Sequence, residues 1–231
     1  MGMIRYIKEE IEIIRERDPA IKSNAEVFLY PSFKAIMWYR VAHKLYLKKH
    51  YFLARYISQK TARKTGIEIH PGAKIGKGLF IDHGHGVVIG ETAVLGENVT
   101  LYQGVTLGGT GKENGKRHPT LGDNVMVSAG AKILGSFTVG SNSKIGSGSV
   151  VVSEVPPNST VVGVPGRVVK RNGVKLPQND LNQTDLPNPD LMDINKLEKE
   201  NAELRNILTQ FMNHVERAEK RKRKEKINEN L

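Results

Sequence analysis

The sequence feature that most constrains the fold is an aliphatic residue that recurs every six positions through the middle of the chain. Such a period fits neither a helix nor a β-hairpin. It is typical of a parallel β-helix, in which each hexapeptide forms a short strand and a turn, and three hexapeptides form one triangular coil. The aliphatic residues then stack inward, and glycine serves the corners, where positive φ is needed. The thirteen positions are Ile69, Ile75, Ile81, Ile89, Leu95, Leu101, Leu107, Leu121, Val127, Ile133, Val139, Ile145 and Val151.

Two insertions interrupt this period. From Ile81 to Ile89 the spacing is eight residues, and the segment between them contains DHGHG. From Leu107 to Leu121 the spacing is fourteen residues, so GGTGKENGKRHPT must leave the solenoid as a loop. In repeat proteins, insertions map to loops, and loops often carry the functional site. Counting repeats places the two insertions at different corners of one prism, and a trimer would bring one subunit's corner to another subunit's loop.

The N-terminal segment, residues 1–60, is expected to be helical. Its first isoleucines recur at three- and four-residue steps, which places them on one face of a helix. They are Ile4, Ile7, Ile11 and Ile14. The Asp18-Pro19 pair ends this helix, because the residue before a proline is disfavoured in the helical region. A second helical region follows to about Lys60, and its apolar positions include Phe28, Trp38, Val41, Leu45 and Leu53.

After the solenoid, the sequence predicts a linker and then a helix. The β-helix is expected to cover residues 61–171, and residues 172–190 are polar and rich in proline and asparagine, which is typical of a linker. Residues 191–226 follow a heptad repeat and carry a basic tail. A coiled coil is favoured over an amphipathic helix docked on the same chain, because the apolar stripe is narrow. Its a positions are Ile194, Asn201, Leu208 and Val215, and its d positions are Leu197, Leu204, Phe211 and Ala218.

Composition and charge narrow the class of protein. The hydrophobic share of 39% sustains a core, but no run of about 18 apolar residues is present to span a membrane. The N-terminus lacks the apolar stretch of a signal peptide, so we expect a cytoplasmic protein without a membrane partner. The absence of cysteine excludes disulfides and cysteine-based zinc sites. The net charge of +11 is unevenly spread: RAEKRKRKEK (217–226) holds seven Lys/Arg against two Glu, which suits a solvated helix end better than nucleic-acid binding. The remaining excess suits a phosphorylated small molecule.

The first insertion is expected to place a histidine near a carboxylate. Glu68 starts the first coil, and one coil later the chain returns to the same corner near Val88. Glu68 should therefore lie one strand spacing, roughly 5 Å, from the corner that carries His83. A carboxylate there can fix the imidazole tautomer and stabilise its protonated form. This geometry makes His83 a candidate general base, and the alternative is that His83 only caps the turn.

The second insertion carries Arg117 and His118 in one glycine-bearing loop. This pair can hold a carboxylate substrate, because guanidinium pairs with carboxylate in a bidentate way. The alternative is a mobile surface loop with scattered charge. Metal binding is a further alternative, since His70, His83 and His85 add ligands to His118 and some β-helix enzymes bind zinc through histidines of neighbouring subunits. Only His83-x-His85 shows close ligand spacing, so no metal is expected.

Four segments together resemble bacterial serine acetyltransferases. They are IHPGAKIGKGLFIDHGHGVVIGETAVLG, VTLGGTGKENGKRHPTLGDNV, SAGAKILG and VPPNSTVVGVPGR, within residues 10–171. The pairing of DHGxG with TLGGTGK…RHP is specific to that family, whereas the hexapeptides alone indicate only a broad acyltransferase superfamily. The resemblance implies an α + β solenoid with a left-handed parallel β-helix. It also implies acetyl transfer from acetyl-CoA to the hydroxyl of L-serine, giving O-acetyl-L-serine for cysteine biosynthesis; the alternative is another hydroxyl or amino acceptor, such as a sugar.

The resemblance also implies roles for particular residues. His83 matches the general base that removes the serine hydroxyl proton, and a base poised near neutral pH suits this task. Glu68, in IEIHP, stands where the family usually has the aspartate of a sequence like VDIHP. The residues that match serine-binding positions are Asp18, Asp82, Arg117 and His118.

For acetyl-CoA, the resemblance implies a path along a solenoid corner. Backbone amides near Gly108 and Gly109 are expected to steady the developing oxyanion. The positions along the path are Ala129, Lys144 and Ser147, with Arg167 and Lys170 available for the phosphates.

The resemblance implies a homotrimer. Many relatives have a longer N-terminal helical region that joins two trimers, whereas this chain starts near its RDPA segment, so a plain trimer is expected. The C-terminal coiled coil is a candidate for higher-order assembly, and Asn201 at an a position commonly favours two strands rather than three. Many relatives end in an isoleucine that binds the cysteine-synthesising sulfhydrylase (cysteine synthase). This chain ends in Leu231, which leaves that complex an open question.

Overall fold

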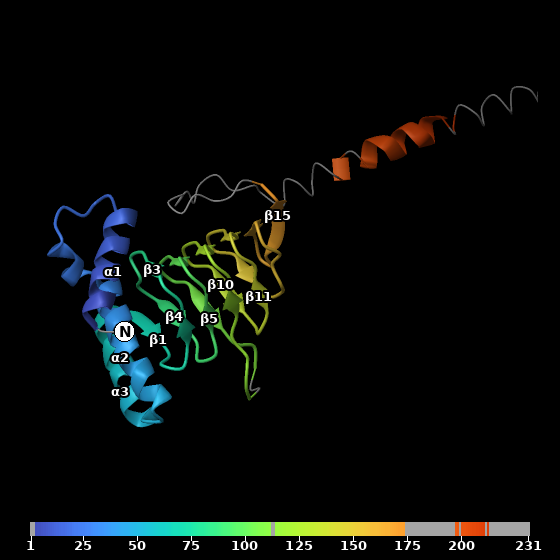
Figure 1. Ribbon diagram of the computed structural model, residues 1–231. Coiled ribbons are helices and arrows are strands. Elements are labelled where there is room, and N and C mark those ends of the chain that lie inside the picture. The colour runs from blue at the N-terminus through green and yellow to red at the C-terminus, as the bar shows by residue number, and fades with distance from the viewer. Residues whose placement is uncertain (1–2, 112–113, 174–196, 199, 211, 213–231) are drawn as a thin grey trace, which may run out of the picture. The chain divides into compact units, whose positions relative to one another are not determined.

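A computed structural model describes most of the chain (Figure 1). The described residues are 3–111, 114–173, 197–198, 200–210 and 212. The chain separates into two units, Met1–Pro187 and Asn188–Leu231, which are treated separately below. In the second unit, residues 200–210 are helical, as the heptad repeat predicts, and Ile194, Phe211, Val215 and Ala218 lie outside the residues whose side chains are described.

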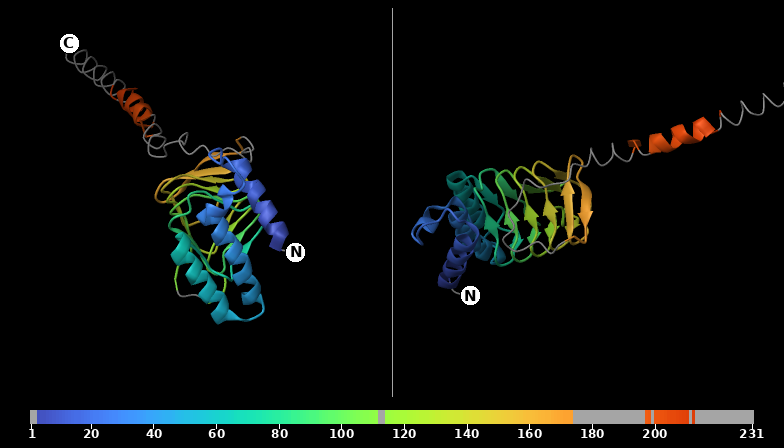
Figure 2. Two further views of the ribbon diagram at one scale, coloured as in Figure 1. Left: turned by 90° about the vertical axis from the view of Figure 1, so that its left-hand side faces the viewer. Right: turned by 90° about the horizontal axis from the view of Figure 1, so that it is seen from above.

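Helices cover the end of the solenoid at which the chain enters it (Figures 1 and 2). They are α1 (Met3–Arg17), the short 3-10 helix η1 (Glu26–Leu29), α2 (Pro31–Leu47) and α3 (Tyr51–Thr65). α1 ends before Asp18-Pro19, as predicted. The second helical region is two helices rather than one, because the chain turns at Lys49, whose φ is 66°. α3 ends at Gly66, whose left-handed φ of 71° is the usual conformation after a helix.

The solenoid consists of three sheets, and up to β13 each sheet collects every third strand. The first sheet holds β1 (Ile67–Ile69), β4 (Val87–Ile89), β7 (Thr106–Gly108), β10 (Lys132–Leu134) and β13 (Val150–Val151). The second holds β2 (Lys74–Ile75), β5 (Val94–Leu95), β8 (Thr120–Leu121) and β11 (Thr138–Val139). The third holds β3 (Phe80–Ile81), β6 (Thr100–Leu101), β9 (Met126–Val127), β12 (Lys144–Ile145), β14 (Ser159–Val162) and β15 (Arg167–Arg171). All pairs are parallel except β14 with β15, which is antiparallel.

The thirteen aliphatic residues of the six-residue repeat form the core. All of them are buried. The strand register stacks each on its counterpart in the next coil, as in Ile69 with Ile89 and Ile89 with Leu107. Burying one such side chain contributes about 1.5–3 kcal/mol, so the stack is the main source of solenoid stability. The parallel β-helix predicted from the repeat is therefore confirmed.

A column of glycines forms the corner between the third and first sheets. Gly86, Gly104, Gly130 and Gly148 have φ of 75°, 70°, 70° and 68°. Each of the last three donates its N–H to a carbonyl one coil earlier, for example Gly148 to Ala129 at 2.9 Å. Since these residues have no side chains, the backbone lies bare along this corner, which agrees with the role predicted for glycine.

Asparagine instead forms the corner between the second and third sheets. Asn98, Asn124, Asn142 and Asn158 all have φ between 56° and 60°. The side-chain amides form a ladder: Asn124 donates to Asn142 and Asn142 to Asn158, each at 3.1 Å. Asparagine tolerates this left-handed conformation better than other residues with a side chain, and the ladder adds hydrogen bonds that glycine cannot make.

The end of α1 is fixed to the third sheet by Arg17, which is buried. Its guanidinium donates to the Gly78 carbonyl at 3.3 Å and to the Thr100 hydroxyl at 3.1 Å. Because Asp18 follows directly, this anchor also determines where Asp18 lies.

Earlier in α1, burial raises the pKa of Glu10 to about 8, despite the nearby cations of Arg40 and Arg17. No helix among the described residues combines the length and apolar character of a membrane span.

Candidate active site

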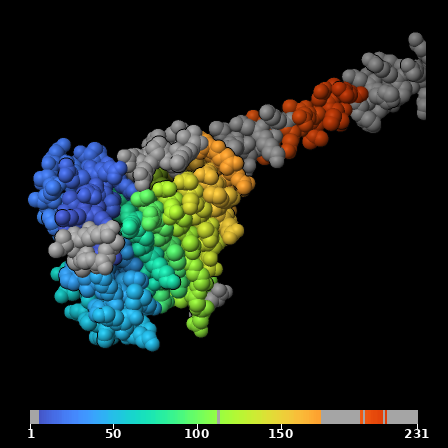
Figure 3. All heavy atoms as spheres, in the orientation of Figure 1, coloured from blue at the N-terminus to red at the C-terminus, as the bar shows by residue number. Residues whose placement is uncertain are grey.

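The two insertions lie at different corners of the prism, as the repeat count predicts. DHGHG connects β3 in the third sheet to β4 in the first sheet. The longer loop connects β7 in the first sheet to β8 in the second, and it projects from the solenoid (Figure 3). Within one chain, therefore, the candidate base and the candidate carboxylate-binding pair are separated by the width of a sheet.

The corner of the first insertion turns sharply at His83. His83 has φ of 58°, and Gly84 follows with 80°. The Gly84 N–H donates to the Asp82 carbonyl at 2.6 Å, and a Cβ at Gly84 would overlap the side chain of Ile67. A left-handed histidine is strained, and such strain persists where the surrounding structure fixes it, often at functional sites. The turn leaves the His83 side chain 74% exposed, with its Nε2 3.9 Å from Oδ1 of Asp82.

Asp18 and Asp82 come together at this same corner. The Tyr30 hydroxyl donates to Oδ2 of Asp18 at 2.5 Å, and the Ala20 N–H donates to Oδ1 at 2.8 Å. Burial raises the pKa of Asp82, the neighbouring His83 opposes this rise, and the nearby carboxylate of Asp18 adds to it. The structure thus gathers three predicted site residues, two acids and one histidine, from α1's C-terminal end and the β3–β4 turn.

Glu68 lies one coil below this corner. It pairs with Val88 across β1 and β4, as predicted. Its carboxylate contacts α3, where Nη2 of Arg55 lies at 3.5 Å and Nε2 of Gln59 at 3.3 Å. Within the described part of one chain, the carboxylate close to His83 is therefore Asp82, and Glu68 has partners of its own.

Thr92 organises the second corner. Its Oγ1 accepts the backbone N–H groups of Arg117 and His118, at 3.0 and 3.1 Å, and lies 2.9 Å from Nδ1 of the His118 ring. The Thr92 N–H also donates to Nδ1, at 3.2 Å. Because Nδ1 accepts, the ring proton of neutral His118 is on Nε2. Burial and the neighbouring Arg117 cation lower the pKa of His118, so the ring is neutral at neutral pH.

Arg117 is oriented by a glutamate that the sequence analysis did not identify. Nη2 of Arg117 lies 2.5 Å from Oε2 of Glu91, and the Tyr46 hydroxyl donates to Oε1 at 3.1 Å. Burial acts to raise the pKa of Glu91, but the hydrogen bonds from Arg117 and Tyr46 bring it below its ordinary value. The position of Glu91 in the sequence could have indicated this role. Glu91 and Thr92 follow Gly90 at the corner from which the loop departs one coil later.

Gly90 makes room for this arrangement. A Cβ at Gly90 would overlap the His118 ring. The ring therefore rests directly on the backbone of the preceding coil. His70 lies at the same corner, where burial and the charges of Arg55 and Arg117 lower its pKa.

The residues predicted to bind acetyl-CoA divide between the corners. Gly109 lies beside Arg117, at the second corner. Ala129 and Ser147 precede Gly130 and Gly148 in the glycine column, which begins in the turn that holds His83. Farther along the solenoid, Lys144 is buried on β12, while Arg167 and Lys170 are exposed on β15. Among the described residues, no group of three or more His, Cys, Asp or Glu side chains is placed to hold a metal ion.

Comparisons with known proteins identify the family of the chain. A family profile described as bacterial transferase hexapeptide (six repeats) matches residues 118–153. The serine acetyltransferase of Bacillus subtilis (strain 168) is 54% identical over 226 residues, which cover 97% of this chain and 98% of that one. The serine acetyltransferase of Neisseria gonorrhoeae in complex with serine has a TM-score of 0.69 at 47% identity, covering 73% of this chain and 69% of that one. That of Brucella abortus strain S19 in complex with coenzyme A has a TM-score of 0.70 at 44% identity, covering 74% and 68%. With this identity along nearly its whole length, the chain belongs to the serine acetyltransferase family.

Proposed function

We propose that the protein transfers the acetyl group of acetyl-CoA to the hydroxyl of L-serine, forming O-acetyl-L-serine for cysteine biosynthesis. The observation that carries this proposal is the 54% identity to a serine acetyltransferase over 97% of the chain. The complexes of two similar proteins, one with serine and one with coenzyme A, support the two substrates.

The charges at the two corners complement those of the amino acid. The ammonium group of serine suits Asp18 and Asp82, because the two carboxylates lie close enough for that of Asp18 to add to the rise that burial causes in the pKa of Asp82. The carboxylate of serine suits Arg117, because its guanidinium can form two parallel hydrogen bonds. Neutral His118 presents Nε2–H as a donor to a substrate oxygen. The serine hydroxyl would then point along the solenoid toward the thioester.

His83 is the proposed base. Its imidazole takes the serine hydroxyl proton while the serine oxygen attacks the thioester carbonyl carbon, forming a tetrahedral intermediate. Backbone N–H groups near Gly108 and Gly109 would stabilise the oxyanion. When the intermediate collapses, the C–S bond breaks, and the sulfur leaves with the proton held by His83. A positioned base of this kind typically contributes about 10²–10⁴-fold to the rate.

The orienting acid for His83 is proposed from two carboxylates. Asp82 is 3.9 Å from Nε2. Glu68 lies on the strand beneath the turn, and its contacts to Arg55 and Gln59, at 3.5 and 3.3 Å, are long for hydrogen bonds. Glu68 would serve as the orienting acid after its side chain leaves Arg55 and Gln59.

The protein is proposed to act as a homotrimer. The reason is geometric: the base and the carboxylate-binding pair lie at different corners of one prism, and neighbouring prisms can bring them together. The C-terminal helix adds a second contact, because Leu197, Leu204 and Leu208, at heptad positions a and d, are 62%, 66% and 59% exposed in the single chain.

The direct test of the function measures release of free CoA from acetyl-CoA with a panel of acceptors, including serine, other amino acids and sugars. We expect release to depend on serine. His83→Ala should lose about 10²–10⁴-fold in kcat with its fold retained. His85→Ala, in the same turn, is the matched control and should keep most activity. Release that depends on a sugar rather than serine, or equal loss in both variants, would contradict the proposal.

A further inference from the structure

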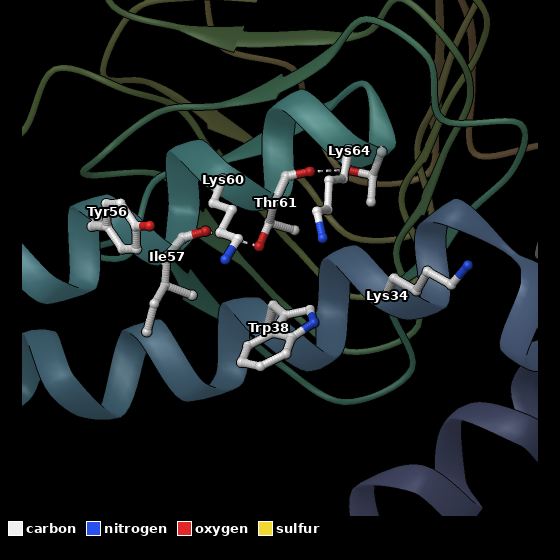
Figure 4. Close-up of a pocket in the computed structure, with 8 residues that line it drawn as sticks. Lys34, Trp38, Tyr56, Ile57, Lys60, Thr61 and Lys64 are labelled. Carbon is white, nitrogen blue, oxygen red and sulfur yellow. Dashed lines mark hydrogen bonds between the residues drawn. The ribbon is translucent and has the colours of Figure 1, made fainter.

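The outer side of the helical region contains a pocket that the proposed reaction does not use. It has a volume of about 570 Å³ and lies between α2 and α3 (Figure 4). Lys34 and Trp38, four residues apart, line it from α2. Tyr56, Lys60 and Lys64, also four residues apart, line it from α3. Pockets for small molecules usually measure about 300–1,000 Å³, so this one has room for a metabolite.

The charge of the pocket has one sign. Three lysines line it, and none of its eight lining residues is a carboxylate. Figure 4 shows Lys60 and Lys64 extending from α3 toward α2, while Lys34 extends along α2 at one end. Like charges four residues apart on a helix repel each other and destabilise it. An anion bound between these lysines would remove that repulsion.

Two aromatic rings complete the pocket. Trp38 and Tyr56 line the pocket and are 52% and 51% exposed, so about half of each side chain is accessible to a ligand. Nζ of Lys60 lies 5.9 Å from the centre of the Tyr56 ring. Exposed aromatic rings beside cations are the elements that proteins use to stack a flat ring and hold its phosphate.

We propose that this pocket binds a phosphate joined to a flat ring, the chemistry of a nucleoside phosphate. The ring would stack on Trp38 or Tyr56, and the phosphate would pair with Lys60 and Lys64. This chemistry has two sources, a free nucleotide and the nucleotide end of CoA. The site is separate from the proposed active site, because none of its lining residues belongs to either insertion corner.

The chain supplies its own probe for this site. Trp38 is its only tryptophan, so fluorescence excited selectively in tryptophan reports on this pocket. We would titrate the full-length protein with ADP, without serine or acetyl-CoA, and excite at the red edge of the tryptophan band to avoid absorption by the nucleotide. We expect a saturable change in emission. Adenosine lacks the phosphate, and inorganic phosphate lacks the ring. Each should bind at least about tenfold more weakly than ADP, since each loses one set of contacts.

Variants separate the pocket from general charge. Lys60→Gln/Lys64→Gln should weaken ADP binding at least about tenfold, the loss expected when two phosphate contacts go. Lys74→Gln/Lys77→Gln removes the same charge from exposed positions on the solenoid and should leave binding unchanged. Displacement of ADP by CoA at lower concentrations than ADP itself requires would identify CoA as the source, and weaker or absent displacement would identify a free nucleotide. The proposal is overturned by a flat titration, by phosphate binding as well as ADP, or by equal effects of the two double variants.

Discussion

At the residue scale, Thr92 determines which nitrogen of His118 carries the proton. Its hydroxyl oxygen accepts two backbone N–H groups, so its own proton is available for Nδ1 of the ring. With Nδ1 occupied and the pKa lowered, His118 is a neutral donor through Nε2 rather than a second base. The two histidines of the proposed site thus differ: the His118 ring is fixed by Thr92, whereas the His83 side chain is exposed.

Glu91 is expected to act on serine binding through Arg117. Glu91→Gln keeps the shape of the side chain but removes the charge that orients the guanidinium, so KM for serine should rise about tenfold with a smaller change in kcat. Tyr46→Phe is the matched control: it removes the other hydrogen bond of Glu91 and spares the pair with Arg117. Steady-state kinetics and thermal unfolding together check this. A loss of thermal stability with KM unchanged would show that Glu91 is only structural.

At the element scale, two corners of the solenoid are built from different residues, glycine at one and asparagine at the other. The glycine column leaves backbone exposed beside the turn that holds His83. The asparagine corner, away from that turn, joins successive coils through side-chain amides. The side-chain ladder therefore adds hydrogen bonds at the asparagine corner, whereas the glycines have only their backbone to join one coil to the next.

The asparagine ladder should make a measurable contribution. Asn142 donates one amide hydrogen bond and accepts another. Asn142→Gly keeps the left-handed backbone but loses both bonds, at about 1–2 kcal/mol. Asn142→Ala loses the bonds and also strains the backbone, which adds about 1 kcal/mol. Denaturant unfolding should rank the variants asparagine, glycine, alanine in decreasing stability. Equal stability of the alanine and glycine variants would argue against the strained φ.

The sequence predicted the solenoid strands and the N-terminal helical region, but not the contacts between elements. The six-residue period assigned each of the aliphatic core residues to its sheet, because one side chain per strand must point inward. The ladder was visible only as a recurring Gly-x-Asn in LGEN, LGDN and VGSN. Glu91 and Thr92 were not identified, since their roles depend on how the loop folds back onto an earlier coil. The contact of Glu68 with α3 likewise depends on helix docking, which no local pattern specifies.

At the scale of the whole molecule, the proposed site is incomplete in one chain. His83, Asp18 and Asp82 form one half at the corner of the third and first sheets, and Arg117 with His118 forms the other at the next corner. A cyclic trimer would create three equal sites, each built from two neighbouring subunits.

Mixed trimers test this arrangement. His83→Ala and His118→Ala should each be nearly inactive, because each damages one half of every site. After the two are unfolded together and refolded, random mixing should restore about one quarter of wild-type activity, since one subunit must supply each intact half. A mixture of His83→Ala with Asp82→Ala, damaged in the same half, should restore none. Absence of recovery in the first mixture, with wild type refolding normally, would place the whole site in one subunit.

The glycine column also sets the length of the corner between the third and first sheets. Successive coils are about 4.8 Å apart, so the corner from His85 to Ser147 spans roughly 14 Å of bare backbone. On the path that the family resemblance implies for acetyl-CoA, the extended ligand lies along this edge. Its reactive end is at the histidine turn and its charged end is toward β15. The number of coils between the histidine turn and β15 then corresponds to the length of the bound acyl carrier. Because each coil adds one position to this corner, the length of the edge changes in steps of one coil, about 4.8 Å.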